Sequence, residues 1–323
     1  MNLLVLLDHG DGRLRPTALE LLTLARDVPG ARVHAVWVGA APGEEARAAV
    51  AAHGAAVLHH VLVEGADDRL TASVVDALEA VRAEVDAPLL LVASTFEGKE
   101  VAARLAGRTG AGVVTGAGAL ELGADGRFVA GKTVLAGTWT TRCAVTAPFG
   151  VVALAPNAVQ AAPVDGAGAL DVVEHRVAAS AAARAVTVHS REPRPTSDRP
   201  ALAEAEVVVV GGRGVEGDFS LVEELADVLG GAVGATRVAT DEGWIGHEAQ
   251  VGQTGVTISP RLYVGAGVSG AVHHRGGMAA SVTVVAVNSD PDAPIFEFAD
   301  YGIVGDLTEV LPALSDEIRR RRS

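Results

Sequence analysis

The chain contains a single cysteine, Cys143, among its 323 residues. One thiol can form neither an internal disulfide nor a cysteine-rich metal site, so the sequence predicts a protein of a reducing compartment, the cytoplasm. Aromatic residues are also scarce, at 3% of the chain. The hydrophobic share nevertheless reaches 49%, mostly as alanine, valine and leucine, which is enough for a folded core and excludes global disorder.

Positive charge is in deficit, with 26 Lys and Arg against 40 Asp and Glu and a formal net charge of −14. This balance argues against nucleic acid or an anionic membrane as the main partner, although a local basic pocket could still hold one phosphorylated small molecule. No uncharged apolar run approaches the ~20 residues of a membrane-spanning helix, so no membrane insertion is expected. Residues 1–8 lack a basic segment and are interrupted by Asp8, which predicts a strand rather than a signal peptide.

Short apolar runs alternate with helical patterns through residue 155. They predict strands at 3–7, 33–37, 57–60 and 89–93, and helices at 17–27, 44–52, 70–85 and 97–109. This alternation is typical of a mostly parallel sheet that helices cover on both faces. From 112 to 153, strand-like pieces with glycine-rich turns predict additions to the sheet rather than a new domain.

A proline-rich, charged stretch at 191–200 is the best linker in the chain, and we place a domain boundary there, giving domains 1–195 and 196–323. The sequence before it could form strands at 172–177 and 186–189. After it we expect strands at 207–210, 255–258, 262–264 and 282–287, and helices at 220–229, 269–278 and 306–320. The predicted fold class is therefore α/β, with two domains that each hold a mostly parallel sheet covered by helices.

Two glycine strings, 212–217 and 265–270, match the pattern G-x-G-x-x-G. Each follows an apolar strand and precedes a predicted helix, where free backbone N–H groups and the helix dipole favour phosphate. Arg213 adds a cation inside the first string. With 38 glycines in the chain the string alone is weak, and two tight turns are the structural alternative. No well-placed acidic residue supports NAD.

Several other polar segments allow two interpretations. The segments 234–237 and 250–255 offer hydrogen-bonding groups to a planar heterocycle, or are only turns. Asn288 ends a predicted strand at the carboxyl edge, where open α/β sheets bind ligands. Asp306 could bind there or simply cap the last helix.

Neither metal binding nor bond-making catalysis is indicated. The neighbouring side chains of His273 and His274 diverge, as do those of His59 and His60, so neither pair easily shares a metal ion. No Ser-His-Asp triad or pair of catalytic carboxylates is legible. We therefore predict no catalytic and no metal-binding residue.

Residues 207–310 resemble, in order and spacing, the alpha subunit of electron-transfer flavoprotein. The matching stretches are 211–214, 234–237, 250–255, 262–270, His274, 288–296 and 299–306. The first half resembles the N-terminal domain of this family more loosely, through 88–94 with Gly98 and Lys99.

The resemblance implies an electron carrier rather than an enzyme. Its second domain would be a Rossmann- or flavodoxin-like unit that holds FAD, and its partner would be a beta subunit that binds AMP. The heterodimer would carry electrons from flavin dehydrogenases, such as the acyl-CoA dehydrogenases of fatty acid beta-oxidation, to a quinone reductase of the respiratory chain. The residues leave open a dinucleotide-dependent oxidoreductase with its own small substrate and, with less support, a nucleotide-binding sensor.

The resemblance also assigns roles around FAD. Arg213 would lie near the phosphates, Thr236 and Arg237 near the isoalloxazine, and the Thr254 hydroxyl near flavin N5. Residues 269–274 would span the diphosphate and the flavin O2 edge, and Asn288 and Asp306 the adenosine side. Where the family usually has Gln before His274, this chain has His273. The predicted FAD-binding residues are Arg213, Thr236, Arg237, Gln250, Val251, Gly252, Gln253, Thr254, Ser269, Gly270, Ala271, Val272, His273, His274, Asn288, Asp306 and Leu307.

Overall fold

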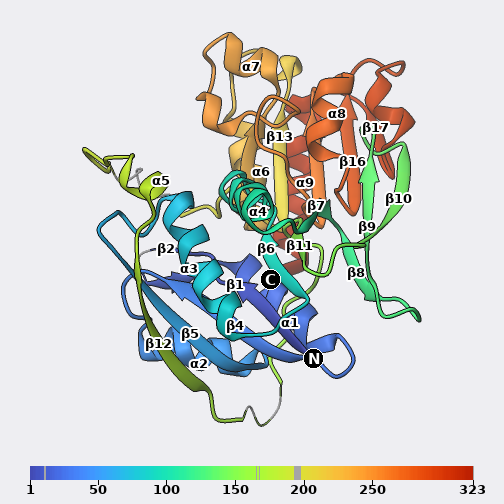
Figure 1. The fold of residues 1–323 in the computed structure, drawn as a ribbon. Helices are drawn as coiled ribbons and strands as arrows, with labels where there is room; N and C mark the ends of the chain where they lie inside the picture. The colour runs from blue at the N-terminus through green and yellow to red at the C-terminus, as the bar shows by residue number, and fades with distance from the viewer. Residues whose placement is uncertain (11, 165, 167, 193–197, 323) are drawn as a thin grey trace. The chain divides into compact units, whose positions relative to one another are not determined.

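The computed structural model describes residues 1–10, 12–164, 166, 168–192 and 198–322 (Figure 1). The chain divides into two compact units, one made of Met1–Lys132 and Thr141–Pro193 and the other of Thr133–Thr140 and Arg194–Ser323. The predicted domain boundary, between residues 195 and 196, lies outside the described residues.

The first unit is built on a seven-stranded sheet in which all strand pairs are parallel. The strand order is β12-β5-β4-β1-β6-β11-β7. All five residues of β6 are buried, as expected of a central parallel strand with both faces covered. The strands are β1 (Asn2–Leu6), β4 (Arg32–Val38), β5 (Ala55–Glu64), β6 (Leu89–Ala93), β7 (Gly112–Ala117), β11 (Gly150–Leu154) and β12 (Asp171–Ala178).

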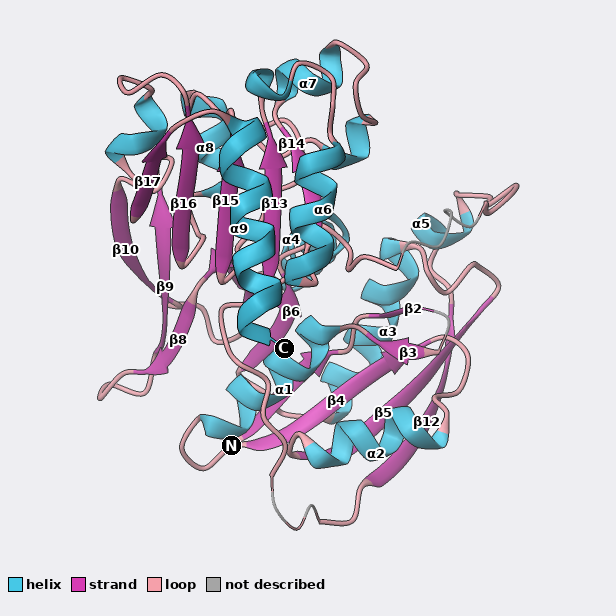
Figure 2. Ribbon diagram, turned by 180° about the vertical axis from the view of Figure 1, so that it is seen from behind, coloured by secondary structure: helices cyan, strands magenta, loops and turns pink. Residues whose placement is uncertain are grey.

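Helices cover both faces of this sheet (Figure 2). On one face, α1 (Pro16–Asp27) and α2 (Glu44–Ala52) pack over a core that includes Trp37. On the other, α3 (Thr71–Glu84) and α4 (Phe96–Thr109) pack over Val61 and Leu90. A short helix, α5 (Ala181–Arg184), follows β12.

The second unit holds a five-stranded parallel sheet in the order β14-β13-β15-β16-β17. The strands are β13 (Val207–Gly211), β14 (Ala232–Ala235), β15 (Leu262–Ala266), β16 (Thr283–Asn288) and β17 (Tyr301–Val304). The chain runs from β13 to the edge strand β14 and then returns to β15 on the other side of β13. This is the flavodoxin-like order, and its topological switch point lies between β13 and β15, where such sheets bind ligands at their carboxyl ends.

Helices α6 (Ser220–Leu229) and α9 (Leu307–Arg322) lie side by side on one face of this sheet (Figure 2). Helix α8 (Val272–Met278) packs on the opposite face through Met278. The remaining short elements are α7 (Arg237–Asp241), after β14, and the 3-10 helices η1 (Arg213–Val215), η2 (His247–Ala249) and η3 (Pro294–Glu297). The predicted two-domain α/β fold class is confirmed.

Some predicted elements are wrong. Residues 186–189 form no strand, and the predicted strand at 255–258 contributes only an isolated bridge between Val251 and Val256. The sequence pattern also missed β14, α7, β17 and a two-stranded hairpin of β2 (His9–Gly10) and β3 (Arg13–Leu14). These elements have two to five residues, too few for a periodic signal.

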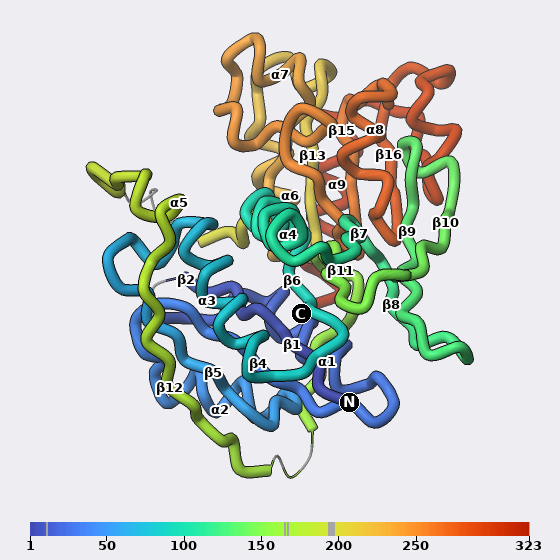
Figure 3. The backbone as a smooth tube through the Cα atoms, in the orientation of Figure 1, coloured from blue at the N-terminus to red at the C-terminus, as the bar shows by residue number. Residues whose placement is uncertain are grey.

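The segment 112–153 only partly extends the large sheet. β7 and β11 join it, but β8 (Ala119–Leu122), β9 (Phe128–Val134) and β10 (Trp139–Ala144), drawn in green in Figure 3, form a separate three-stranded sheet. β8 and β9 are antiparallel, and burial alternates along β8 and at the start of β9, unlike the continuous buried run of β6. Residues 133–140, around the β9–β10 turn, belong to the second unit.

Candidate functional site

Two glycine-rich loops meet at the switch point of the second sheet. The backbone N–H of Gly212 donates to the Ala266 carbonyl at 2.9 Å, and that of Gly214 donates to the Gly267 carbonyl at 3.1 Å. A Cβ atom on Gly212 would lie 2.3 Å from the Gly267 oxygen, so no side chain fits there. These glycines therefore hold the two loops together, and the two N–H groups are not free for phosphate.

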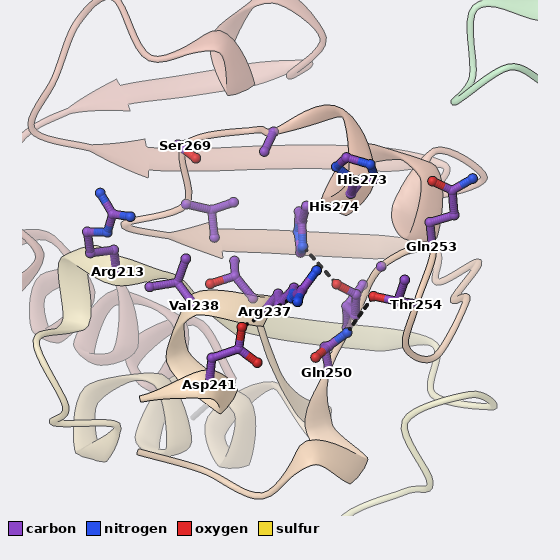
Figure 4. Close-up of a pocket in the computed structure, with 15 residues that line it drawn as sticks. Arg213, Arg237, Val238, Asp241, Gln250, Gln253, Thr254, Ser269, His273 and His274 are labelled. Atoms are coloured by element: carbon purple, nitrogen blue, oxygen red, sulfur yellow. Dashed lines mark hydrogen bonds and ion pairs between the residues drawn. The ribbon is translucent and has the colours of Figure 1, made fainter. Parts of the chain in front are cut away.

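A pocket of about 380 Å³ lies at the carboxyl ends of β13, β14 and β15 (Figure 4). All of its lining residues belong to the second unit. They come from the loops after β13 and β15, from α7 with the residue before it, from the segment 250–254 and from the start of α8. The lining is Arg213, Thr236, Arg237, Val238, Asp241, Gln250, Val251, Gly252, Gln253, Thr254, Val268, Ser269, Ala271, His273 and His274.

Twelve of the seventeen predicted FAD-binding residues line this pocket. The five that do not are Gly270, Val272, Asn288, Asp306 and Leu307. The pocket adds Val238, Asp241 and Val268, which sequence reasoning missed. Asp241 and Val238 share α7 with Arg237, so recognising that helix would have identified both.

The Thr254 hydroxyl is oriented by a polar network. The Gln250 side-chain Nε2 donates to Thr254 Oγ1 at 3.0 Å, and Gln250 Oε1 lies 3.0 Å from the Thr240 hydroxyl. Because Thr254 Oγ1 already accepts a hydrogen bond, its own proton can be donated to an occupant of the pocket.

His274 is a buried residue of the pocket lining, and both of its ring nitrogens are engaged. Its Nδ1 lies 3.0 Å from the Val251 carbonyl oxygen, which can only accept, so Nδ1 carries the proton. Its Nε2, 2.7 Å away, therefore accepts from the Tyr263 hydroxyl. Burial lowers the pKa of His274 to about 4 and raises that of Tyr263. His274 is thus neutral near pH 7 and, in this geometry, has no N–H left for a ligand.

The lining also carries an ion pair and an unpartnered hydroxyl. Arg237 is 69% exposed, and its Nε lies 3.1 Å from Asp241 Oδ2, one turn further along α7. The buried Oγ1 of Thr236 has no hydrogen-bond partner among the described residues. Together with Arg213, the lining has two arginines against one carboxylate, which favours an anionic occupant with a hydrogen-bonding group for Thr236.

Asn288 and Asp306 lie outside this pocket and form hydrogen bonds within the chain, and their predicted role at the adenosine side stays a prediction. Asn288 Nδ2 donates to the Val268 carbonyl at 2.9 Å, and its Oδ1 accepts from the Asp290 N–H at 3.0 Å. Asp306 Oδ1 accepts from the N–H and the hydroxyl of Thr308, at 2.8 and 2.7 Å, and these bonds lower the pKa of Asp306. This is the N-cap of α9 that the sequence allowed.

Among the residues that the structure describes, no helix is long and apolar enough to cross a membrane. Within the same residues, no three His, Cys, Asp or Glu side chains are grouped so that they could hold a metal ion.

Comparison with known families identifies the family to which the chain belongs. A family model described as "Electron transfer flavoprotein FAD-binding domain" matches residues 201–279, and one described as "Electron transfer flavoprotein domain" matches residues 3–180. The second match alone spans more than half of the chain. The chain belongs to the electron transfer flavoprotein alpha-subunit family. The resemblance inferred from the sequence is confirmed.

Curated relatives match along the whole chain. The chain is 42% identical over 324 residues to electron transfer flavoprotein subunit alpha of Mycobacterium leprae, covering 99% of this chain and 98% of that protein. It is 43% identical over 326 residues to the protein of the same name from Mycobacterium tuberculosis, with 99% of each covered. It is 39% identical over 319 residues to that of Syntrophomonas wolfei, with 98% of each covered.

Every residue that lines the pocket falls inside the matched FAD-binding domain. FAD is therefore the cofactor of this chain, as predicted, and the family to which the chain belongs is one of electron carriers.

Proposed function

We propose that this chain is the FAD-carrying subunit of a heterodimeric electron transfer flavoprotein. It takes electrons from flavin dehydrogenases, such as acyl-CoA dehydrogenases, and passes them to a quinone reductase of the respiratory chain. The observation that carries the proposal is the pocket at the switch point of the second sheet, which gathers twelve predicted FAD-binding residues inside the matched FAD-binding domain.

The donor set of the pocket fits FAD. When bound, FAD supplies the ring that accepts and releases electrons. Arg213 is exposed at the end of β13, where a guanidinium can pair with a phosphate. Thr254 could donate its hydroxyl proton to a ring nitrogen, and bound FAD would supply the partner that the buried Thr236 hydroxyl lacks.

The same groups favour a carrier over an oxidoreductase with its own substrate. Asp241, the one carboxylate in the described lining, is ion-paired with Arg237. The imidazole of His274 is neutral and has both nitrogens engaged. Neither group is free to act as an acid or base on a separate substrate.

The partner that we propose is a beta subunit carrying AMP, as the sequence resemblance implies. The relatives are each named a "subunit alpha", which supports a second subunit. We place the complex in the cytoplasm, a reducing compartment that suits the single, half-buried and free Cys143.

The test is to co-express the chain with the beta-subunit candidate and purify the complex. We expect one FAD per chain, AMP in the acid extract, and bleaching of the flavin absorbance when catalytic acyl-CoA dehydrogenase and an acyl-CoA are added anaerobically. A complex that retains no flavin would overturn the proposal. So would a flavinated complex that no flavin dehydrogenase reduces, but that turns over a small substrate with NAD(P)H.

A further inference from the structure

Five side chains that carry charge or can titrate line the pocket. They are Arg213, Arg237, Asp241, His273 and His274. Arginine stays charged at all working pH values, and Asp241 is held in an ion pair with Arg237. Any change of charge in this lining near neutral pH must therefore come from a histidine.

His274 is not that histidine. Its Nε2 already accepts from Tyr263, its Nδ1 donates to Val251, and its burial disfavours the charged form. Protonating it would replace the Tyr263 hydrogen bond with two buried donors facing each other. His273 is therefore the residue whose charge can change near neutral pH.

His273 has a fixed backbone and an exposed side chain. Its carbonyl accepts the N–H of Gln253 at 2.9 Å, which ties the first turn of α8 to the 250–254 segment. The same helix packs so closely on that segment that a Cβ on Gly277 would lie 2.4 Å from the Gly252 Cα. Among the described residues, none hydrogen-bonds to the His273 ring, which is exposed on the pocket lining (Figure 4).

The charged groups around His273 already interact with other side chains or are themselves cationic. On α8 itself, the guanidinium of Arg275 lies over the Phe298 ring, 4.7 Å from its centre. On α7, Arg237 and Asp241 pair with each other, and the 250–254 segment carries no charge. In the described lining, a new negative charge on the occupant therefore has His273 as its one titratable counter-charge.

We propose that His273 is a charge-compensating residue that couples the reduction of bound FAD to proton uptake by the protein. This inference rests on the proposed function, in which FAD occupies the pocket. Two electrons from an external reductant and one proton from water leave the reduced ring with one negative charge. His273 takes up a second proton from water, because an imidazolium lowers the free energy of an adjacent anion. Reoxidation returns both electrons to an acceptor and both protons to solvent.

The test uses the flavinated complex with its beta subunit, reduced stepwise by dithionite between about pH 5 and 8. The midpoint potential at each pH gives the number of protons taken up per two electrons. The variant is His273→Gln, and the matched control is His247→Gln, an exposed histidine of the same unit that does not line the pocket. We expect the wild type and His247→Gln to approach two protons in part of this range, and His273→Gln to stay at one throughout.

A second measurement does not depend on a variant. In NMR spectra of the wild-type complex, the titration of the His273 ring should move to higher pH when FAD is reduced, while that of His247 stays in place. Equal proton uptake in the wild type and His273→Gln, or a His273 titration that ignores the flavin redox state, would overturn this proposal alone. A wild-type complex without FAD would overturn the proposed function as well.

Discussion

His34 and His59 share a buried hydrogen bond across neighbouring strands of the first sheet, with 3.0 Å between His34 Nδ1 and His59 Nε2. The series of hydrogen-bonded imidazole rings continues to β12, where His175 Nε2 lies 2.9 Å from His59 Nδ1. His175 Nδ1 in turn lies 3.5 Å from a Glu84 oxygen on α3. If Nδ1–H of His175 donates a hydrogen bond to Glu84, every neutral ring carries its hydrogen on Nδ1. His34 Nε2 is then a bare acceptor, and it indeed has no partner among the described residues.

Acid should destabilise the first unit through this histidine chain. Burial, His175 and His34 lower the pKa of His59 from 6.5 to about 4, so the folded state binds this proton less readily than the unfolded state. The neutral His59 ring therefore contributes to the stability of the folded state in full above about pH 6.5. This contribution, up to about 3 kcal/mol in the free energy of unfolding, is lost as the pH falls towards 4. Urea unfolding at several pH values in this window measures it. The dependence of the free energy of unfolding on pH should be weaker in His59→Gln but unchanged in His247→Gln. Identical pH profiles for the wild type and His59→Gln would contradict the assignment.

Gly212→Ala should separate the two loops at the switch point. The added Cβ would meet the Gly267 carbonyl oxygen at 2.3 Å, and backbone cannot move aside as a flexible side chain can. We expect a loss of about 1–3 kcal/mol in the free energy of unfolding, together with weaker FAD retention. The control is Gly276→Ala, also in the second unit, where the nearest atom, Gln253 Cβ, lies at an ordinary 3.7 Å. Thermal unfolding and flavin content should separate the two variants, and equal losses would count against this account.

Thr236→Val should move stability and FAD affinity in opposite directions. The Thr236 hydroxyl is buried without a partner, so its removal should stabilise the FAD-free protein by about 1 kcal/mol. The same removal takes a hydrogen bond from bound FAD, and affinity should fall about five-fold. Urea unfolding of the FAD-free complex and fluorescence titration with FAD measure the two effects. Thr236→Ser keeps the hydroxyl and is the control; a destabilised FAD-free Thr236→Val protein would show that the hydroxyl has a partner after all.

Arg237→Ala and Asp241→Asn should shift the reduction potential of bound FAD in opposite directions. The two side chains form an exposed ion pair at the pocket wall, 3.1 Å apart. Removing the cation leaves the reduced, negatively charged ring less stabilised and lowers the potential, whereas removing the carboxylate releases the cation and raises it. Because both groups are exposed and screened, each shift should be on the order of 30 mV. Redox titration against a reference dye measures both, and shifts of the same sign would place the pair away from the ring.

The sequence predicted those parts of the fold in which the pattern of apolar residues directly shows which positions are buried. Leu89–Ala93 is apolar at every position, and both of its strand bounds were predicted, because a central parallel strand is buried on both faces. Ala232–Ala235 is also a strand, but alanine and glycine carry no strand preference, and this segment depends on pairing with β13. Such pairing is a property of the sheet rather than of four residues.

The same distinction applies to the site. Thr254 and His274 were found through spacing that resembles a known family, and both line the pocket. Asp241 was missed because α7 has only five residues. The hydrogen bond between His34 and His59 could not be foreseen either, since it depends on the register of β4 against β5 and on a ring orientation that no pattern encodes.

Residues 133–140 make the two units inseparable by a single cut. They belong to the second unit, and a Cβ on Gly137 would lie 2.7 Å from that of Ala279, yet they are encoded in the middle of the first unit. The polypeptide therefore passes from one unit to the other three times. A recombinant fragment that starts after the proline-rich stretch at 191–200 would lack this turn, and residues 133–140 taken alone would include only the end of β9 and the start of β10. A self-contained flavin-binding fragment would have to graft residues 133–140 back on, for example through an engineered linker.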